Sequence, residues 1–134
     1  AVDMLTDKNQ PDGLKRIAKL FRFILDVVRN GDRRGCLMCN AAAGPASQDD
    51  DISNAVSAML GRMTQAFSTA LSATSSGATR TSAQARESQA RGLTAAYVGL
   101  RILAKSGAPI LDLEAAASAA IAMAHNKPIN IPHK

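Results

Sequence analysis

Apolar residues recur at every third or fourth position along four long segments of this chain, a spacing that matches the 3.6-residue turn of an α-helix. The clearest stripe comprises Leu14, Ile17, Leu20, Phe21, Ile24, Leu25 and Val28. No segment alternates apolar and polar residues with the period of two that marks a β-strand. We therefore expect an all-α domain of about five helices.

Local signals place the ends of the first three helices. The first begins after Pro11 and Asp12 and ends at Asn30 and Gly31, because glycine readily adopts the left-handed conformation that ends a helix. A short, buried helix is predicted over residues 36–43, closed by Gly44 and Pro45. Residues 49–51 are three aspartates that suit a helix start, since a carboxylate can cap the free amides there. A third helix should follow, to about residue 71.

The second half of the chain predicts two longer helices. Residues 74–80 are small and polar and predict a mobile loop. Thr81 and Gln84 have capping-box spacing at the start of a helix that reaches Lys105. Residues 106–109 form a short turn, and a last helix covers residues 110–125.

The composition favours one domain that gains by dimerising. The 134 residues are 46% hydrophobic but only 3% aromatic, so each apolar residue buries little area. We assign residues 1–126 to a single domain. Residues 127–134, with Pro128 and Pro132, predict an extended and poorly ordered tail.

Two glycines indicate a close helix contact. Gly92 and Gly99 lie two turns apart in the fourth predicted helix, and each costs about 1 kcal/mol relative to alanine in a helix interior. They would allow another helix to pack almost against the backbone, either within the chain or across a dimer. The residues predicted for a four-helix dimer seam are Gly92, Ala96, Gly99, Leu100, Leu103, Leu113, Ala117, Ala120, Ile121 and Ala124.

The charge pattern argues against nucleic-acid binding by this domain itself. The formal net charge is +5, and Lys15, Lys19, Arg22 and Arg29 fall near one helix face. No aromatic side chains are interleaved to stack bases, so we interpret this face as solvated. The chain has no apolar run long enough to span a bilayer, and residues 1–10 lack the basic and hydrophobic regions of a secretory leader. We therefore expect a cytoplasmic protein without a membrane partner.

Cys36 and Cys39 form a C-x-x-C pair. A structural zinc ion needs two more ligands, and the only histidines, His125 and His133, lie at a helix end and in the predicted tail. A thioredoxin-like enzyme needs strands that are not predicted here. The pair is either buried as small apolar side chains or acts as a thiol sensor beside Arg33 and Arg34. We expect no metal, no cofactor and no catalysis, because no nucleophile motif is present.

Two motifs resemble the C-terminal domain of TetR-family transcriptional regulators. Residues 34–42 read R-G-C-L-M-C-N-A-A, similar to the family's R-G-C-L-x-x-N-A-A signature. Residues 99–105 read G-L-R-I-L-A-K, similar to the end of that family's penultimate helix. Together the motifs anchor nearly the whole chain.

The resemblance implies an effector-controlled repressor that acts as a homodimer. The last two long helices would form the dimer bundle. A small-molecule effector would lie between the earlier helices and the penultimate one, in contact with Phe21, Leu25, Met38, Met59, Met63, Phe67 and Tyr97. Operator DNA would be bound only through an N-terminal helix-turn-helix domain that this chain lacks, and the effector would change the spacing of two such domains.

Two other interpretations stay open from the residues. One is a thiol-redox helical protein that uses Cys36 and Cys39. The other is a helical dimerisation module without a ligand, for which we expect a closed core with no cavity. The methionines and Phe67 named for the pocket would then be ordinary core residues.

Overall fold

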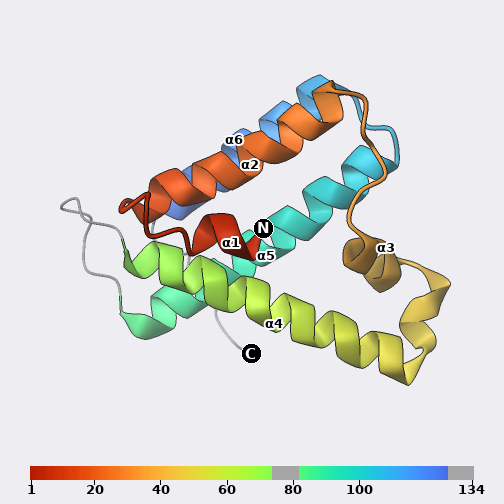
Figure 1. Cartoon of the computed structure of the whole chain (residues 1–134), viewed down its shortest axis with the longest axis horizontal. Coiled ribbons are helices and arrows are strands. Elements are labelled where there is room, and N and C mark those ends of the chain that lie inside the picture. The colour runs from red at the N-terminus through yellow and green to blue at the C-terminus, as the bar shows by residue number, and fades with distance from the viewer. Residues whose placement is uncertain (74–81, 127–134) are drawn as a thin grey trace, which may run out of the picture.

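Every regular element in the described part of the computed structural model is a helix. The structure describes residues 1–73 and 82–126, and these ranges contain six α-helices and one 3-10 turn, η1 (Figure 1). Their bounds are α1 Val2–Leu5, α2 Gly13–Arg29, α3 Leu37–Ala43, η1 Pro45–Gln48, α4 Asp50–Ser72, α5 Ala83–Lys105 and α6 Ile110–His125. The expected all-α class is confirmed.

Helices α2 to α6 correspond to the five helices expected from the sequence, whereas α1 and η1 were not predicted. The predicted loop at 74–80, the predicted tail at 127–134 and Thr81 of the predicted capping box lie outside the described residues. Helix α5 is capped instead by Ser82, whose hydroxyl accepts a hydrogen bond from the Ala85 amide at 3.1 Å.

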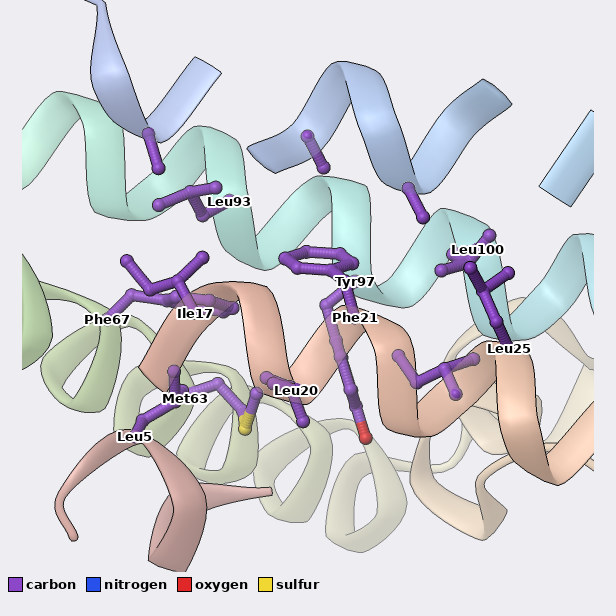
Figure 2. Close-up of a cluster of buried hydrophobic side chains, with 14 of the residues drawn as sticks. Leu5, Ile17, Leu20, Phe21, Leu25, Met63, Phe67, Leu93, Tyr97 and Leu100 are labelled. Atoms are coloured by element: carbon purple, nitrogen blue, oxygen red, sulfur yellow. The ribbon is translucent and has the colours of Figure 1, made fainter. Parts of the chain in front are cut away.

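Four long helices enclose the core. Helix α2 lies beside α6 along one edge of the molecule, α4 crosses the opposite side, and α5 contacts both α4 and α6 (Figure 1). The core contains Ile17, Leu20, Phe21 and Leu25 of α2, Met63 and Phe67 of α4, and Leu93, Tyr97 and Leu100 of α5 (Figure 2). This arrangement buries the apolar stripe that predicted the first helix.

The helix ends follow their local chemistry. The Asp12 side chain accepts from the Leu14 amide at 3.0 Å at the start of α2, and Gly31, with φ of 91°, follows that helix. At the start of α4, the Asp49 carboxylate accepts from the amides of Asp51 and Ile52 at 2.9 and 3.1 Å. The predicted role of the aspartates is confirmed at Asp49.

Helix α2 approaches the end of α4 so closely that only glycine fits at its first position. A Cβ atom on Gly13 would lie 1.5 Å from the carbonyl oxygen of Ala70, which is itself buried. The Gly13 amide also donates to the carbonyl of Ala73 at 3.4 Å. This contact fixes the crossing of the two helices.

Helix α3 differs from its prediction in burial. It was expected to be buried, but Cys39 is its one buried residue and the side chain of Leu37 is 81% exposed. The prediction of a buried helix from the apolar run over residues 36–43 is therefore wrong in burial, although a helix is present. One face of α3 contacts α4 and α5, and the other faces outward.

Four basic side chains of α2 lie on the surface. Lys15, Lys19, Arg22 and Arg29 are all exposed. Arg29 forms ion pairs with Asp26 at 3.1 Å and with Glu114 of α6 at 2.8 Å. Such exposed pairs contribute little stability, but the second one joins α2 to α6 at the surface.

Candidate functional site

A pocket of about 340 Å³ opens where α1, α4 and α5 meet the segment before α3. It is lined by Ala1, Val2, Asp3, Cys36, Met59, Arg62, Met63 and Tyr97. The volume lies at the small end of the range of ligand pockets, and the lining combines apolar side chains with a few polar groups, as such pockets usually do.

Helices α4 and α5 hold the apolar part of the pocket in place. Met59 is half-buried, whereas Met63 and Tyr97 are 3% and 7% exposed and also belong to the core. The hydroxyls of Thr64 and Thr94 are 2.9 Å apart and join α4 to α5 beside these residues. The pocket wall is thus tied to the packing of the two helices.

The wall formed by α1 is held by a buried arginine. Arg16 of α2 is 6% exposed, and its guanidinium donates to the carbonyls of Gln10 at 2.6 Å and Leu5 at 3.4 Å. Leu5 itself is fully buried. These contacts and the packing of Leu5 in the core hold this four-residue helix in place, since helices this short are unstable alone in water.

The segment that carries Cys36 is positioned by its neighbours. Arg33 donates to the carbonyls of Ala104 and Ala108 at 3.1 and 2.7 Å, which caps the end of α5. Gly35 has φ of +78°, a left-handed conformation that favours glycine. The Asn40 side chain then donates to the Arg34 carbonyl at 3.0 Å. The R-G-C-x-x-x-N part of the first motif therefore encodes a turn that delivers Cys36 to the pocket.

The two thiols occupy different environments. Cys36 is partly exposed and lines the pocket, whereas Cys39, one helical turn later, is fully buried. Burial raises the pKa of Cys36, but hydrogen bonds from Cys39 and from the Met38 amide outweigh it and lower the pKa overall. Burial, together with the hydrogen bond to Cys36, raises the pKa of Cys39 to about 12. Cys36 is therefore the more acidic and more accessible thiol of the pair.

Arg101 places a positive charge near this pair. Its field lowers the pKa of both thiols and also acts on Tyr97, whose pKa is nevertheless raised by burial. The Nε atom of Arg101 is buried and has no hydrogen-bond partner among the described residues. A buried guanidinium donor without a partner favours negative charge nearby.

The structure brings together only some of the residues predicted for the pocket. Met59, Met63 and Tyr97 line it, and so does Cys36. Phe21 and Phe67 are fully buried and stack on each other, with ring centroids 6.3 Å apart. Leu25 is a core residue, 7% exposed, and Met38 is half-buried; neither lines the pocket.

Arg62 and the α1 residues Val2 and Asp3 line the pocket but were not predicted. A signal for Arg62 exists in the sequence, because Met59, Arg62 and Met63 share one helix face at spacings of three and four residues. No comparable pattern marks Val2 and Asp3, which reach the pocket because α1 packs on α2 and α4.

The residues predicted for a dimer seam divide into two groups. Leu100, Leu113, Ala117, Ala120 and Ala124 are 6% exposed or less and pack within this single chain. Gly92 faces α6 of the same chain, since a Cβ atom there would lie 3.4 Å from the Met123 sulfur. Leu103 is 45% exposed, Ala96, Gly99 and Ile121 are partly exposed, and a Cβ atom on Gly99 would meet no atom within 4 Å. Of the residues predicted for the seam, only this exposed group, Ala96, Gly99, Leu103 and Ile121, is open to contact with a second subunit.

Within residues 1–73 and 82–126, no cluster of three or more histidine, cysteine or acidic side chains could hold a metal ion. Over the same ranges, no helix combines the length and the hydropathy needed to cross a bilayer. Comparison of the chain with protein-family models, with curated proteins and with solved structures finds no match.

Proposed function

We propose that this chain is the effector-binding and dimerisation part of a TetR-type transcriptional repressor, and that its effector binds in the pocket of Met59, Met63 and Tyr97. The observation that carries the proposal is the pocket itself, of about 340 Å³, whose wall includes α4 and α5, two of the helices that the resemblance implicates.

The lining defines the chemical class of the effector. Met59 and Met63 offer thioether side chains that adapt to irregular apolar shapes. Arg62 and Asp3 supply charge beside them. The best fit is a small, mostly apolar molecule with one polar or anionic group.

The contacts around the pocket would couple effector binding to the positions of neighbouring helices. Tyr97 lies on α5, three residues after Thr94, which joins α5 to α4, and the end of α5 is capped by Arg33 from the segment that carries Cys36. A ligand that favours one spacing of α4 and α5 would shift the position of α1. In a repressor of this type the DNA-binding helices precede this domain, so such a shift would change operator affinity.

Dimerisation is proposed through the exposed face of α5 near Gly99 and Leu103. Leu103 is 45% exposed, and Leu111 at the start of α6 is 73% exposed. Large apolar side chains at adjacent helix ends are suited to an isologous contact with a second copy. The buried alanines of α6 would then stabilise the subunit and not the dimer contact.

Binding of 1-anilinonaphthalene-8-sulfonate, an apolar dye with one anionic group, tests the effector proposal. We expect saturable binding of one dye per chain, monitored by fluorescence. Met59→Trp places a larger side chain in the pocket and should weaken binding by roughly tenfold, or about 1.4 kcal/mol. Met123→Leu is the matched control, because Met123 packs against Gly92 away from the pocket lining. Equal dye affinity in both variants would contradict the proposal.

A further inference from the structure

The arrangement of the two cysteines suggests a chemical role that ligand binding does not use. Cys36 lines the pocket and is reachable from it, while Cys39 is fully buried directly behind it and hydrogen-bonds to it. An accessible thiol backed by a second, protected thiol is the arrangement needed for a thiol that is first oxidised and then resolved.

We propose that Cys36 is an oxidation site for a hydroperoxide and that Cys39 is its resolving thiol, so that the pair forms an intramolecular disulfide in the pocket wall. The inference rests on the proposed function in one respect only, that the pocket admits a small molecule. It does not require the effector to be bound.

The chemistry balances with the hydroperoxide as the oxidant. The Cys36 thiolate attacks the terminal oxygen of the hydroperoxide, the O–O bond breaks, and the departing alkoxide takes a proton to leave as an alcohol. Cys36 is now a sulfenic acid. The Cys39 sulfur attacks the Cys36 sulfur, an S–S bond forms, the S–O bond breaks, and the hydroxide leaves as water with the Cys39 proton. Two thiols have lost two electrons and two protons.

The surroundings of Cys36 favour the first step. The amide of Met38 and the thiol of Cys39 hydrogen-bond to its sulfur, and the charge of Arg101 acts on it. The buried Nε of Arg101 has no partner in the described part of the chain, so a negative sulfur or a sulfenate oxygen nearby would offset an otherwise unfavourable burial. Cys39 is held protonated by its burial, so it does not compete for the oxidant.

The backbone also allows the second step. Cys36 is the residue before α3, with φ of −100° and ψ of 130°; its carbonyl accepts the first helical bond, from the Asn40 amide at 2.9 Å, but its own backbone angles are not helical. Cys39 is three residues later, and side chains at this spacing have Cβ atoms about 5–6 Å apart. In a disulfide the two Cβ atoms lie about 3.5–4.5 Å apart. A movement on the order of 1 Å at the start of α3 would therefore bring the two cysteines within bonding distance.

Mass spectrometry of the intact wild-type chain after treatment with hydrogen peroxide tests the proposal without any substitution. Cleavage after Arg34 and Arg62 gives one peptide, residues 35–62, that holds both cysteines. We expect this peptide to lose two hydrogens and to regain them with a dithiol reductant. A peptide that keeps two free thiols, or disulfides that join two chains, would overturn the proposal.

Two variants assign the roles of the cysteines. In Cys39→Ser, peroxide should leave a sulfenic acid on Cys36 that dimedone traps, whereas Cys36→Ser should give little dimedone adduct on Cys39. We expect roughly tenfold or more between the two adduct yields, because reactivity follows thiolate content and access. Equal yields in two variants with wild-type circular dichroism would overturn the assignment.

Dye binding separates this inference from the proposed function. Cys39→Ser should still bind 1-anilinonaphthalene-8-sulfonate, because Cys39 is buried and does not line the pocket. A wild-type protein that binds the dye but forms no disulfide with peroxide would overturn the oxidation site alone. Disulfide formation in a chain that does not bind the dye would support the oxidation site and contradict the effector proposal.

Discussion

The hydroxyls of Thr64 on α4 and Thr94 on α5 lie 2.9 Å apart, in a part of the interface that is otherwise apolar. Thr64 follows Met63 directly, and Thr94 comes one turn before Tyr97. Both Met63 and Tyr97 line the pocket. One polar contact between the two longest helices is therefore adjacent to the residues that shape the candidate effector site.

Thr94→Val should destabilise the domain by about 1 kcal/mol, because Thr64 loses its partner while the side-chain volume hardly changes. Thr94 is 5% exposed, so water cannot fully replace the lost bond. Urea unfolding followed by circular dichroism measures the change. Thr69→Val is the control: its hydroxyl is exposed and bonds only to Gln65 of its own helix. A similar loss in both variants would show that the interhelical bond is not responsible.

Gly99→Ala separates the dimer proposal from simple helix propensity. A Cβ atom at Gly99 meets nothing within 4 Å in one chain, so the substitution should stabilise an isolated subunit by up to about 1 kcal/mol. If a second subunit packs against Gly99, the same methyl group should weaken the dimer, by roughly tenfold in Kd. Sedimentation equilibrium measures this constant.

Gly61→Ala is the matched control for that prediction. Gly61 lies in α4, is exposed, and also has open space around its Cα atom. Its substitution should raise stability and leave the dimer constant unchanged. If both Gly99→Ala and Gly61→Ala keep the dimer Kd of the wild type, the dimer contact does not include Gly99.

The buried thiol of Cys39 predicts a loss of stability at alkaline pH. Below about pH 9 the thiol is protonated in both the folded and the unfolded chain. Between about pH 9 and the folded-state pKa of about 12, the unfolded thiol ionises and the folded one does not, so unfolding releases a proton and stability falls as pH rises.

Urea unfolding at pH values from 8 to 10.5, in steps of ~0.5 pH unit, measures how the free energy of unfolding changes with pH. Cys39→Ala should show a shallower decline in the free energy of unfolding above pH 9 than the wild type. Tyr97→Phe is a second comparison, because burial also raises the pKa of Tyr97 and adds to the decline. Parallel curves for wild type and Cys39→Ala would contradict the burial of that thiol.

The sequence predicts helix boundaries best where the signals are local. Asp12, Asp49 and Gly31 act on the backbone within a few residues, and the structure places helix ends at each of them. Helix α1 has no such signal: it depends on Arg16, which bonds across to Leu5 and Gln10 from a different helix. Contacts of that kind follow from the packing and not from any local pattern.

The site could be predicted only in part for a related reason. Periodicity identifies the apolar face of a helix but does not say which residues on it find a partner. Phe21 and Phe67 stack on each other in the core, whereas Met63 and Met59, one and two turns closer to the start of α4, line the pocket. The position of Cys36 beside them comes from Arg33 and from the turn at Gly35. The motif contains Gly35, but periodicity does not reveal the turn.

The methionine methyl groups allow the most direct test of the effector pocket. The chain has five methionines, of which Met59 and Met63 line the pocket and Met123 packs against Gly92. With methyl-labelled methionine, a titration of 1-anilinonaphthalene-8-sulfonate followed by NMR reports on each site in the unsubstituted protein. We predict saturable shifts of the Met59 and Met63 methyl signals, with the Met123 signal unchanged. Dye binding that moves Met123 and leaves Met59 and Met63 in place would contradict the proposed effector site.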